Sequence, residues 1–173
     1  KEVTDKKTLK EFAYFIYDIY EGDNNFVPPI RKDYLKYLQG VDNDLNNAGP
    51  NTKFICYDGD KVVGRLLVGI NEIVNDYHGF KEGYISQFEC EDNYEYAEKL
   101  LDVAVEYLRA HGMKKVKGPV SLPGGEDNRG FIVDNFEDQP YIMNTYNKSY
   151  YNDFFVKYGF EKYFDCYAYK DTI

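Results

Sequence analysis

Hydrophobic residues recur at three- and four-residue spacing in two long stretches of the chain, and this period predicts amphipathic helices. The first stretch covers residues 9–20, with Asp5 or Thr8 as a cap at its start and Gly22 at its end. The second and clearer stretch covers residues 97–108 and follows polar residues that suit a helix N-terminus. Each predicted helix therefore has one face to bury.

Two shorter helices are predicted from weaker patterns. Asp33 can cap a helix that ends at Gly40. A second short helix is expected over residues 149–157, with Asn147 or Ser149 as its cap. Because glycine readily adopts a left-handed conformation, Gly159 is a suitable residue to end it.

The hydrophobic period changes to that of β-strands after residue 52. The runs 53–57 and 61–70 are separated by Asp58-Gly59-Asp60, and an Asp-Gly turn between such runs predicts a hairpin. After a turn expected at residues 76–79, further strands are predicted at residues 83–90, 114–118, 141–145 and 160–170.

The order of these elements predicts an α/β (α+β) domain. The strand at 83–90, the long helix and the strand at 114–118 form a βαβ unit, whose strands are usually parallel and whose crossover is usually right-handed. The 173 residues suit one domain with a real core, here residues 1–173. The chain begins with Lys1 and not with Met, so it is expected to be cut from a longer protein.

Composition and charge exclude several classes of protein. No apolar run approaches the roughly 20 residues needed to span a bilayer, so a membrane protein is not expected. The net charge of −9 argues against nucleic acid or an anionic membrane surface as a partner. Three widely spaced cysteines form no disulfide framework, which favours a cytoplasmic location. No metal-binding motif occurs, and no metal is assigned.

Residues 119–140 form a long irregular stretch rich in Pro, Gly, Asp and Asn. Such stretches inside a compact domain are more often functional than decorative. Arg129, with Asn128 beside it, is a candidate for binding a phosphate or carboxylate of a substrate. A surface ion pair is the alternative role for Arg129.

The sequence resembles the GNAT superfamily of N-acetyltransferases. The resemblance rests on the hairpin 53–70, the strand and helix of residues 84–108, and the closing run 151–160, which ends in Gly159-Phe160. The segments Lys117-Gly118-Pro119, Tyr146-Asn147 and Tyr150-Tyr151 are similar to a bacterial branch of that superfamily.

This resemblance implies a mixed, mostly antiparallel central sheet flanked by helices. The strands 84–90 and 114–118 would separate, and acetyl-CoA or another acyl-CoA would enter the gap as co-substrate. Its pantetheine arm would lie along Phe88 and Cys90. Its pyrophosphate would meet the amides at the start of the next helix, where the candidate residues are Asn93, Tyr94, Tyr96 and Ala97.

The predicted pyrophosphate loop departs from the family pattern. Residues 91–96 read Glu-Asp-Asn-Tyr-Glu-Tyr, with no glycine and three carboxylates. Glycine lets the backbone approach phosphate closely, whereas carboxylates repel it. Two hypotheses follow. The first is an N-acyltransferase that acts on an amine of a small molecule or peptide. The second is a GNAT-like module that binds a ligand without catalysis.

The resemblance and the chemistry of acyl transfer suggest two catalytic residues. Glu89, near the end of its strand, is the preferred base for the amine, with an exposed structural carboxylate as the alternative. The position at which many family members carry an acidic Tyr is Phe155 here. Tyr151 lies one helical turn earlier and is the candidate acid, with a core aromatic residue as the alternative.

Other polar residues are candidates for orienting the substrate or cofactor. Asn144 and Tyr146 are assigned to the substrate and Asn147 to the cofactor, although such residues also cap helices and turns. His78 is a candidate proton shuttle, with a surface or capping role as the alternative. Cys90 is expected to be a buried hydrophobe and not a nucleophile. A monomer or a homodimer is expected, and an adjoining domain is a further possible partner.

Overall fold

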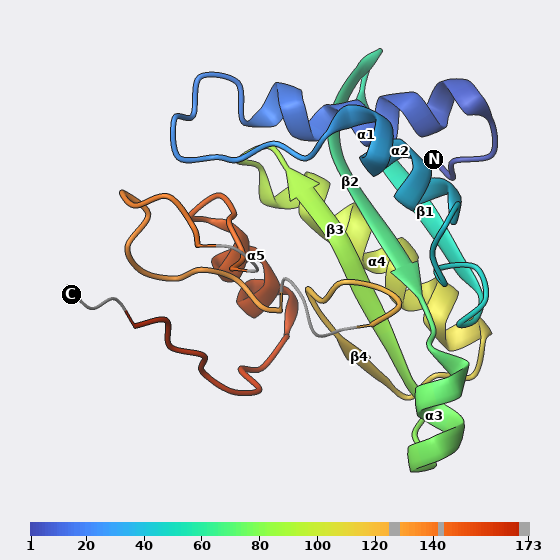
Figure 1. The fold of residues 1–173 in the computed structure, drawn as a ribbon. Coiled ribbons are helices and arrows are strands. Elements are labelled where there is room, and N and C mark those ends of the chain that lie inside the picture. The colour runs from blue at the N-terminus through green and yellow to red at the C-terminus, as the bar shows by residue number, and fades with distance from the viewer. Residues whose placement is uncertain (125–128, 142–143, 170–173) are drawn as a thin grey trace.

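The computed structural model describes residues 1–124, 129–141 and 144–169 (Figure 1). The helices and strands, in chain order, are α1 (Lys6–Ile19), α2 (Arg31–Gln39), β1 (Asn51–Asp58), β2 (Lys61–Gly69), α3 (Glu72–His78), β3 (Glu82–Cys90), α4 (Tyr94–Ala110), β4 (Lys115–Lys117) and α5 (Tyr151–Tyr158). No helix in the described ranges is both long and apolar enough to span a membrane.

The sheet has the order β1-β2-β3-β4. The β1–β2 hairpin and the β2–β3 pair are antiparallel, whereas β4 pairs with β3 in parallel. Helix α4 makes the crossover between β3 and β4 and packs on the sheet (Figure 1). The predicted α+β fold, with a mixed and mostly antiparallel sheet and one βαβ crossover, is confirmed.

Two hydrophobic clusters fill the two faces of the sheet. Helices α1 and α2 cover one face, where Phe12 and Leu67 are fully buried. Helices α4 and α5 pack on the other, where Leu101 and Tyr151 are fully buried. Successive side chains of a strand point alternately to these two cores. A residue's place in the strand therefore decides on which face of the sheet its side chain lies.

The helix caps agree in part with the predictions. Asp5 and Thr8 form a reciprocal capping box at the start of α1, and Asn93 caps α4. Helix α2 begins at Arg31, before Asp33, and no side chain caps it. Nor does a side chain cap α5, because Asn147 is bonded elsewhere.

Three predicted elements differ from the structure. Residues 72–78 form helix α3 and not a turn, because Asn71 caps its start and Gly79 adopts a left-handed conformation at its end. The predicted strand 141–145 is irregular at residues 141, 144 and 145. The predicted strand 160–170 is irregular over residues 160–169, which are mostly exposed. Alternating aromatic residues alone do not form a strand when no neighbouring strand supplies hydrogen bonds.

Candidate functional site

The parallel strands β3 and β4 separate after three pairs. Their pairing runs from Glu82 with Lys115 to Tyr84 with Lys117. One further bond, from the Val120 amide to the Ile85 carbonyl at 2.9 Å, holds the departing chain. Among the described residues, no strand pairs with this edge of β3 from Ser86 to Cys90. The predicted separation of the two strands is therefore confirmed.

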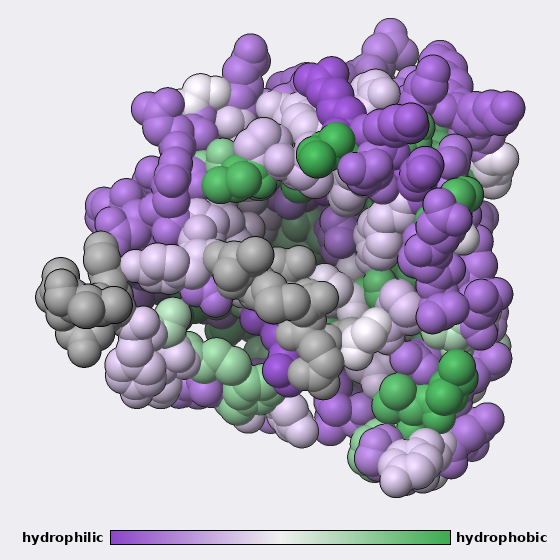
Figure 2. All heavy atoms as spheres, in the orientation of Figure 1, coloured by the Kyte–Doolittle hydropathy of each residue, from purple (hydrophilic) through white to green (hydrophobic). Residues whose placement is uncertain are grey.

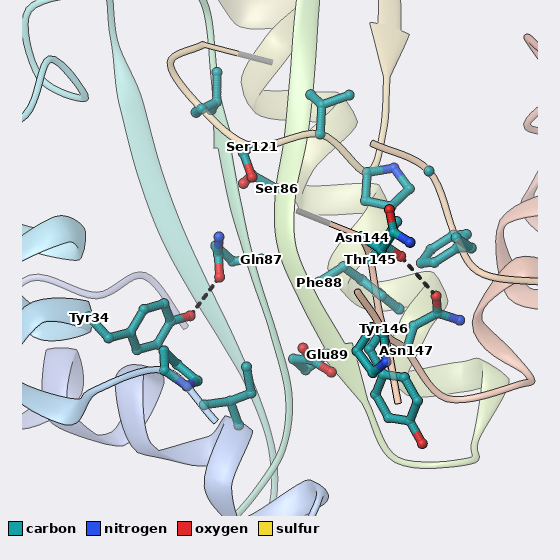
Figure 3. Close-up of a pocket in the computed structure, with 18 of the residues that line it drawn as sticks. Tyr34, Ser86, Gln87, Phe88, Glu89, Ser121, Asn144, Thr145, Tyr146 and Asn147 are labelled. Atoms are coloured by element: carbon teal, nitrogen blue, oxygen red, sulfur yellow. Dashed lines mark hydrogen bonds between the residues drawn. The ribbon is translucent and has the colours of Figure 1, made fainter. Parts of the chain in front are cut away.

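A β-bulge interrupts β3 beside this open edge. Arg65 of β2 pairs with Glu89, but Leu67 pairs with Ser86, so β3 has one extra residue in between. Gln87 has a φ of +52°, a conformation that non-glycine residues seldom adopt. The Tyr34 hydroxyl of α2 donates to Gln87 Oε1 at 2.6 Å and holds the bulge in place (Figure 3). Bulges re-aim side chains next to functional sites.

A cavity of about 870 Å³ opens along this edge of β3. Its walls come from residues 86–89 of β3, from the irregular segments 119–124 and 130–131, and from residues 140–141 and 144–147. Helices α1 and α2 and the chain between them complete the lining. Figure 2 shows the surface hollowed in this part of the molecule, and Figure 3 shows Glu89, Asn144 and Tyr146 around the cavity. From the irregular stretch, residues 119–124, 130–131 and 140 thus contribute to the pocket.

Glu89 is buried, so it is not the exposed carboxylate that the sequence allowed as an alternative. Its exposed fraction is 7%, and it lies on the α1 face of the sheet beside the fully buried Arg65. Arg65 Nη2 lies 4.0 Å from Glu89 Oε1. Burial raises the pKa of Glu89, whereas the charge of Arg65 and a hydrogen bond from Tyr151 lower it. The effect of burial is the larger, so the pKa is raised. The carboxyl is therefore a more basic group than a surface glutamate.

Tyr151 reaches Glu89 across the open edge of β3. Its hydroxyl donates to Glu89 Oε2 at 2.8 Å and accepts from the Cys90 amide at 2.9 Å. Burial and the nearby Glu89 charge raise its pKa well above the usual value for a tyrosine. Its ring packs edge-on against Phe88, with ring centroids 5.1 Å apart. Tyr151 is thus both a core aromatic residue and a polar neighbour of Glu89.

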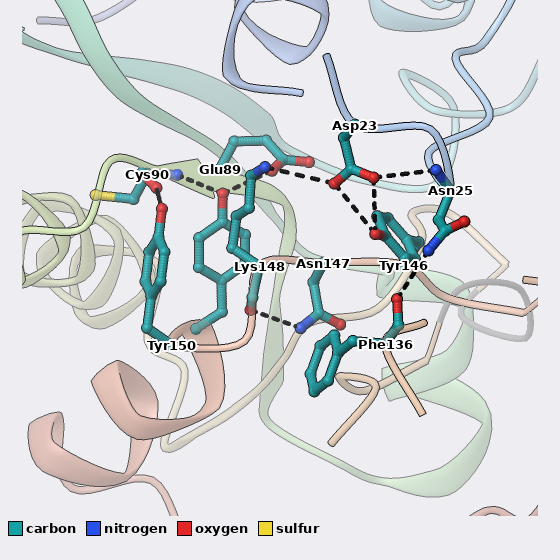
Figure 4. Close-up of polar contacts among 10 residues, drawn as sticks. Asp23, Asn25, Glu89, Cys90, Phe136, Tyr146, Asn147, Lys148 and Tyr150 are labelled. Atoms are coloured by element: carbon teal, nitrogen blue, oxygen red, sulfur yellow. Dashed lines mark hydrogen bonds and ion pairs between the residues drawn. The ribbon is translucent and has the colours of Figure 1, made fainter. Parts of the chain in front are cut away.

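A second polar network lies on the cavity rim (Figure 4). Tyr146 donates to both carboxylate oxygens of Asp23, at 3.0 and 3.1 Å, and Lys148 Nζ lies 3.6 Å from Asp23 Oδ2. Burial and the hydrogen-bonded, charged carboxylate of Asp23 raise the pKa of Tyr146 to about 12. The network ties residues 144–148 to the chain that follows α1.

The predicted cofactor residues fall into two groups. Phe88 lines the cavity, and the neighbouring Cys90 is fully buried with a pKa that burial raises. The Tyr150 hydroxyl donates to the Cys90 carbonyl at 2.9 Å. The Tyr150 and Tyr151 hydroxyls therefore occupy the carbonyl and the amide of Cys90, one of the two residues along which pantetheine was expected to lie.

The other group lies at the start of α4, outside the cavity lining. Asn93 Oδ1 accepts from the Glu95 amide at 3.0 Å, and the Asn93 carbonyl accepts from the Tyr96 amide. Tyr94 packs under the Lys157 ammonium, and Ala97 is fully buried. The assignment of these residues to a pyrophosphate stays a prediction.

The predicted substrate residues are only partly brought together. Asn144, Tyr146 and Asn147 line the cavity. Asn147 is buried and exchanges hydrogen bonds with the backbone of Ile132, which is a structural task. His78 lies at the end of α3, stacked on Phe80, and does not line the cavity.

The loop candidates are less informative. Arg129 is exposed, with its guanidinium over the ring of Phe164. Asn128 lies outside the described residues. Within the described ranges, no group of three or more His, Cys, Asp and Glu side chains is placed to hold a metal ion.

Sequence reasoning missed three residues that position the site: Arg65, Gln87 and Tyr34. For Arg65 a signal existed, because it is the one charged residue in the run 62–69, which is otherwise apolar or glycine. A charge inside a buried strand indicates a buried partner. For Gln87 and Tyr34 the sequence offers no such signal.

No protein-family model matches the chain. Its fold is shown by its likeness to solved structures. The similar structures are mostly acetyltransferases. An aminoglycoside acetyltransferase from an uncultured soil metagenomic sample aligns with a TM-score of 0.56 and 14% identity, covering 100% of this chain and 94% of its own. The chain has the GNAT-like fold. A transcriptional regulator from Bacillus halodurans shares it, with a TM-score of 0.59 and 12% identity over 99% of this chain and 97% of its own.

Another GNAT-like structure was solved with acetyl-CoA. This predicted acetyltransferase from Clostridium acetobutylicum aligns with a TM-score of 0.54 and 15% identity, covering 98% of this chain and 94% of its own. All these identities are low, so the likeness concerns the fold.

Two curated proteins are similar to this GNAT-like chain in sequence. Protein YghO of Escherichia coli is 25% identical over 94% of the chain, and the bacterial ceramide synthase of Caulobacter vibrioides is 24% identical over 94%. The matched regions are 41% and 42% of those proteins. The chain thus spans about two fifths of the length of these curated relatives.

Proposed function

We propose that the protein transfers an acyl group from acyl-CoA to an amine. The observation that carries this proposal is the hydrogen-bonded pair of Glu89 and Tyr151 at the open edge of β3, beside a large cavity. The pair joins a basic carboxylate to a proton-bearing hydroxyl, which are the two groups that acyl transfer to an amine requires. The name of one relative, ceramide synthase, supports this reaction class because a ceramide is an amide.

The residues fit an acyl-CoA at the open strand edge better than at the helix start. Residues 86–88 line the cavity and lack a strand partner on that side, so a pantetheine arm can lie against them. The amides of Glu95 and Tyr96 already have internal acceptors. The donor supplies an activated thioester, and the side chains of this protein supply the proton transfers.

The proposed proton route uses contacts already in place. Glu89 accepts a proton as the amine nitrogen bonds to the thioester carbonyl carbon. The carbon–sulfur bond breaks, and Tyr151 gives its proton to the leaving thiolate. Since Tyr151 donates to Glu89 Oε2 at 2.8 Å, the proton held by Glu89 can return to Tyr151 and restore both groups. General acid–base groups of this kind contribute about 10²–10⁴-fold to rates.

Binding of acyl-CoA is testable without knowing the acceptor. The melting temperature of the protein should rise when acetyl-CoA or a longer acyl-CoA is added. A ligand at about 100 times its Kd stabilises the folded state by roughly 2.7 kcal/mol. Desulfo-CoA and 3′-AMP serve as controls for the nucleotide part. If no acyl-CoA with an acyl chain of two to sixteen carbons raises the melting temperature, acyl-CoA is not the acyl donor.

Replacing Tyr151 by Phe should slow acyl transfer about 10²–10⁴-fold, because the variant lacks the proton donor. The matched control is Tyr150→Phe. The Tyr150 hydroxyl, like that of Tyr151, is hydrogen-bonded to the backbone of Cys90, but Tyr151 is the one of the two that donates to Glu89. Single-turnover rates with a fixed acceptor would separate the two. Equal rates for both variants would exclude Tyr151 as the acid.

A ligand-binding module without catalysis is the second candidate. It is favoured by the occupied main-chain groups of Cys90 and by the carboxylates around the start of α4. Under this alternative, a ligand would bind in the cavity and acyl-CoA would produce no shift in melting temperature.

A further inference from the structure

We propose that the acceptor is an amphiphilic amine, with one amino head group on a hydrocarbon chain. The proposal rests on the acyl-transfer function above and adds the class of acceptor.

The cavity walls carry little charge. Among the described lining residues, Glu89 is the one acidic or basic side chain of the types Asp, Glu, Lys, Arg and His. An acceptor with a carboxylate or phosphate would find no cation on these walls, and burying an unpaired charge is costly. A polyamine or an aminoglycoside would bring several cations to one carboxylate. The walls therefore match an acceptor with a single cationic group.

Polar and apolar walls come from different segments. Gln87, Glu89, Asn144 and Tyr146 supply polar groups around the edge of β3 (Figure 3). Apolar surface comes from the chain between α1 and α2 and from residues 119–123, and includes the lining residues Phe26, Val27, Pro29, Val120, Leu122 and Pro123.

The two kinds of wall meet at Phe26. Its ring centroid lies 6.2 Å from that of Tyr146 and 4.0 Å from that of Tyr20. An amine held near Glu89 can therefore continue into a chain along the apolar wall. The volume of about 870 Å³ is near the top of the usual range for ligand pockets, roughly 300–1,000 Å³, and the pantetheine arm and the acceptor share this space.

Apolar residues remain exposed where the cavity opens. Val27 and Tyr141 both line the cavity, yet 62% and 52% of their surface is exposed. The segments that carry them are tied together, since Asn25 Nδ2 donates to the carbonyls of Phe136 and Glu137 and Gln139 Nε2 donates to that of Asn24. The segments that carry Val27 and Tyr141 thus present apolar side chains at the opening of the cavity, as expected for entry of a hydrocarbon chain.

A series of acceptors tests the proposal, with acetyl-CoA as donor and all amines below their aggregation concentration. The series consists of ethanolamine, 2-amino-1-hexanol and 2-amino-1-decanol, with spermidine and glucosamine as polar controls. The value of kcat/KM should rise about fourfold per added CH₂, which is the fold-change for about 0.8 kcal/mol of burial, until the cavity is filled. Equal or better turnover of spermidine or glucosamine would overturn the proposal.

A matched pair of variants tests the location. Val27→Asp puts a charge at the mouth, whereas Val133→Asp puts the same charge at a site of similar exposure, 66%, that does not line the cavity. Val27→Asp should lower kcat/KM for 2-amino-1-decanol at least tenfold more than it lowers kcat/KM for ethanolamine. Val133→Asp should change neither. Equal effects of the two variants would contradict the assignment of the mouth.

The outcomes distinguish this inference from the proposed function. If short polar amines are acylated and chain length has no effect, the acceptor class is wrong while acyl transfer stands. If acyl-CoA produces no shift in melting temperature and no amine is acylated, acyl transfer itself is wrong.

Discussion

Replacing Glu89 by Gln is expected to lower kcat/KM for acyl transfer about 10²–10⁴-fold, because the amide cannot accept the proton of the attacking amine. The pH dependence should change as well. Burial raises the pKa of Glu89 above the usual 4.5. As pH rises through that raised pKa, the carboxyl loses its proton and becomes the base. The rate of the unmodified protein should therefore increase over this range, and the Gln variant should lack the increase.

A matched control for this variant is Glu11→Gln. Glu11 also accepts a hydrogen bond from a tyrosine hydroxyl, that of Tyr57 at 2.6 Å, but lies away from the cavity. Its replacement should leave both the rate and the pH profile unchanged. A Glu89→Gln protein with full activity and an unchanged acid limb would show that another group is the base.

Replacing Arg65 by Met is expected to reduce the free energy of unfolding by about 3–5 kcal/mol at neutral pH, the cost of leaving one member of a buried ion pair without its partner. Arg65 is fully buried, and its Nη1 also donates to the Phe12 carbonyl at 2.7 Å. Without the guanidinium, the pKa of Glu89 rises further, because burial is then less opposed.

The sign of the pH effect follows from this rise. Below the raised pKa, Glu89 is protonated in the folded variant, and a neutral carboxyl costs less to bury than a carboxylate. The stability lost on Arg65→Met should therefore be smaller at pH 5 than at pH 7. Urea unfolding at both pH values measures the difference.

The double variant Arg65→Met with Glu89→Gln provides the control for the ion pair. It removes both charges, so it should recover much of the stability that Arg65→Met loses at neutral pH. The same loss at both pH values, with no recovery in the double variant, would show that Arg65 acts by packing and its bond to Phe12 alone.

The Glu89–Arg65–Tyr151 cluster also explains why the site needs the separated strands. Glu89 and Arg65 face α1, whereas Tyr151 comes from α5, which packs on the opposite face. A strand paired along the whole of β3 would stand between them. The gap therefore does two things, since it opens the cavity and lets a tyrosine from the other layer reach the carboxylate.

The sequence by itself determined helices α1, α2, α4 and α5, the hairpin and the βαβ unit, but not helix α3. Their periodicity, the Asp58-Gly59 turn and the caps at Asp5 and Asn93 are local signals, and local signals are readable from neighbouring residues. The alternation of β3 also placed Glu89 on the face opposite Phe88 and Cys90.

Only the tertiary structure decided the chemistry of the site. The bulge at Gln87 depends on Tyr34, 53 residues away, and the state of Glu89 depends on Arg65 and Tyr151 from two other elements. The same is true of the predicted strand 160–170, whose alternating aromatic residues had no partner over residues 160–169. Burial, pairing and pKa are set by contacts between distant residues, and a pattern along one chain does not contain them.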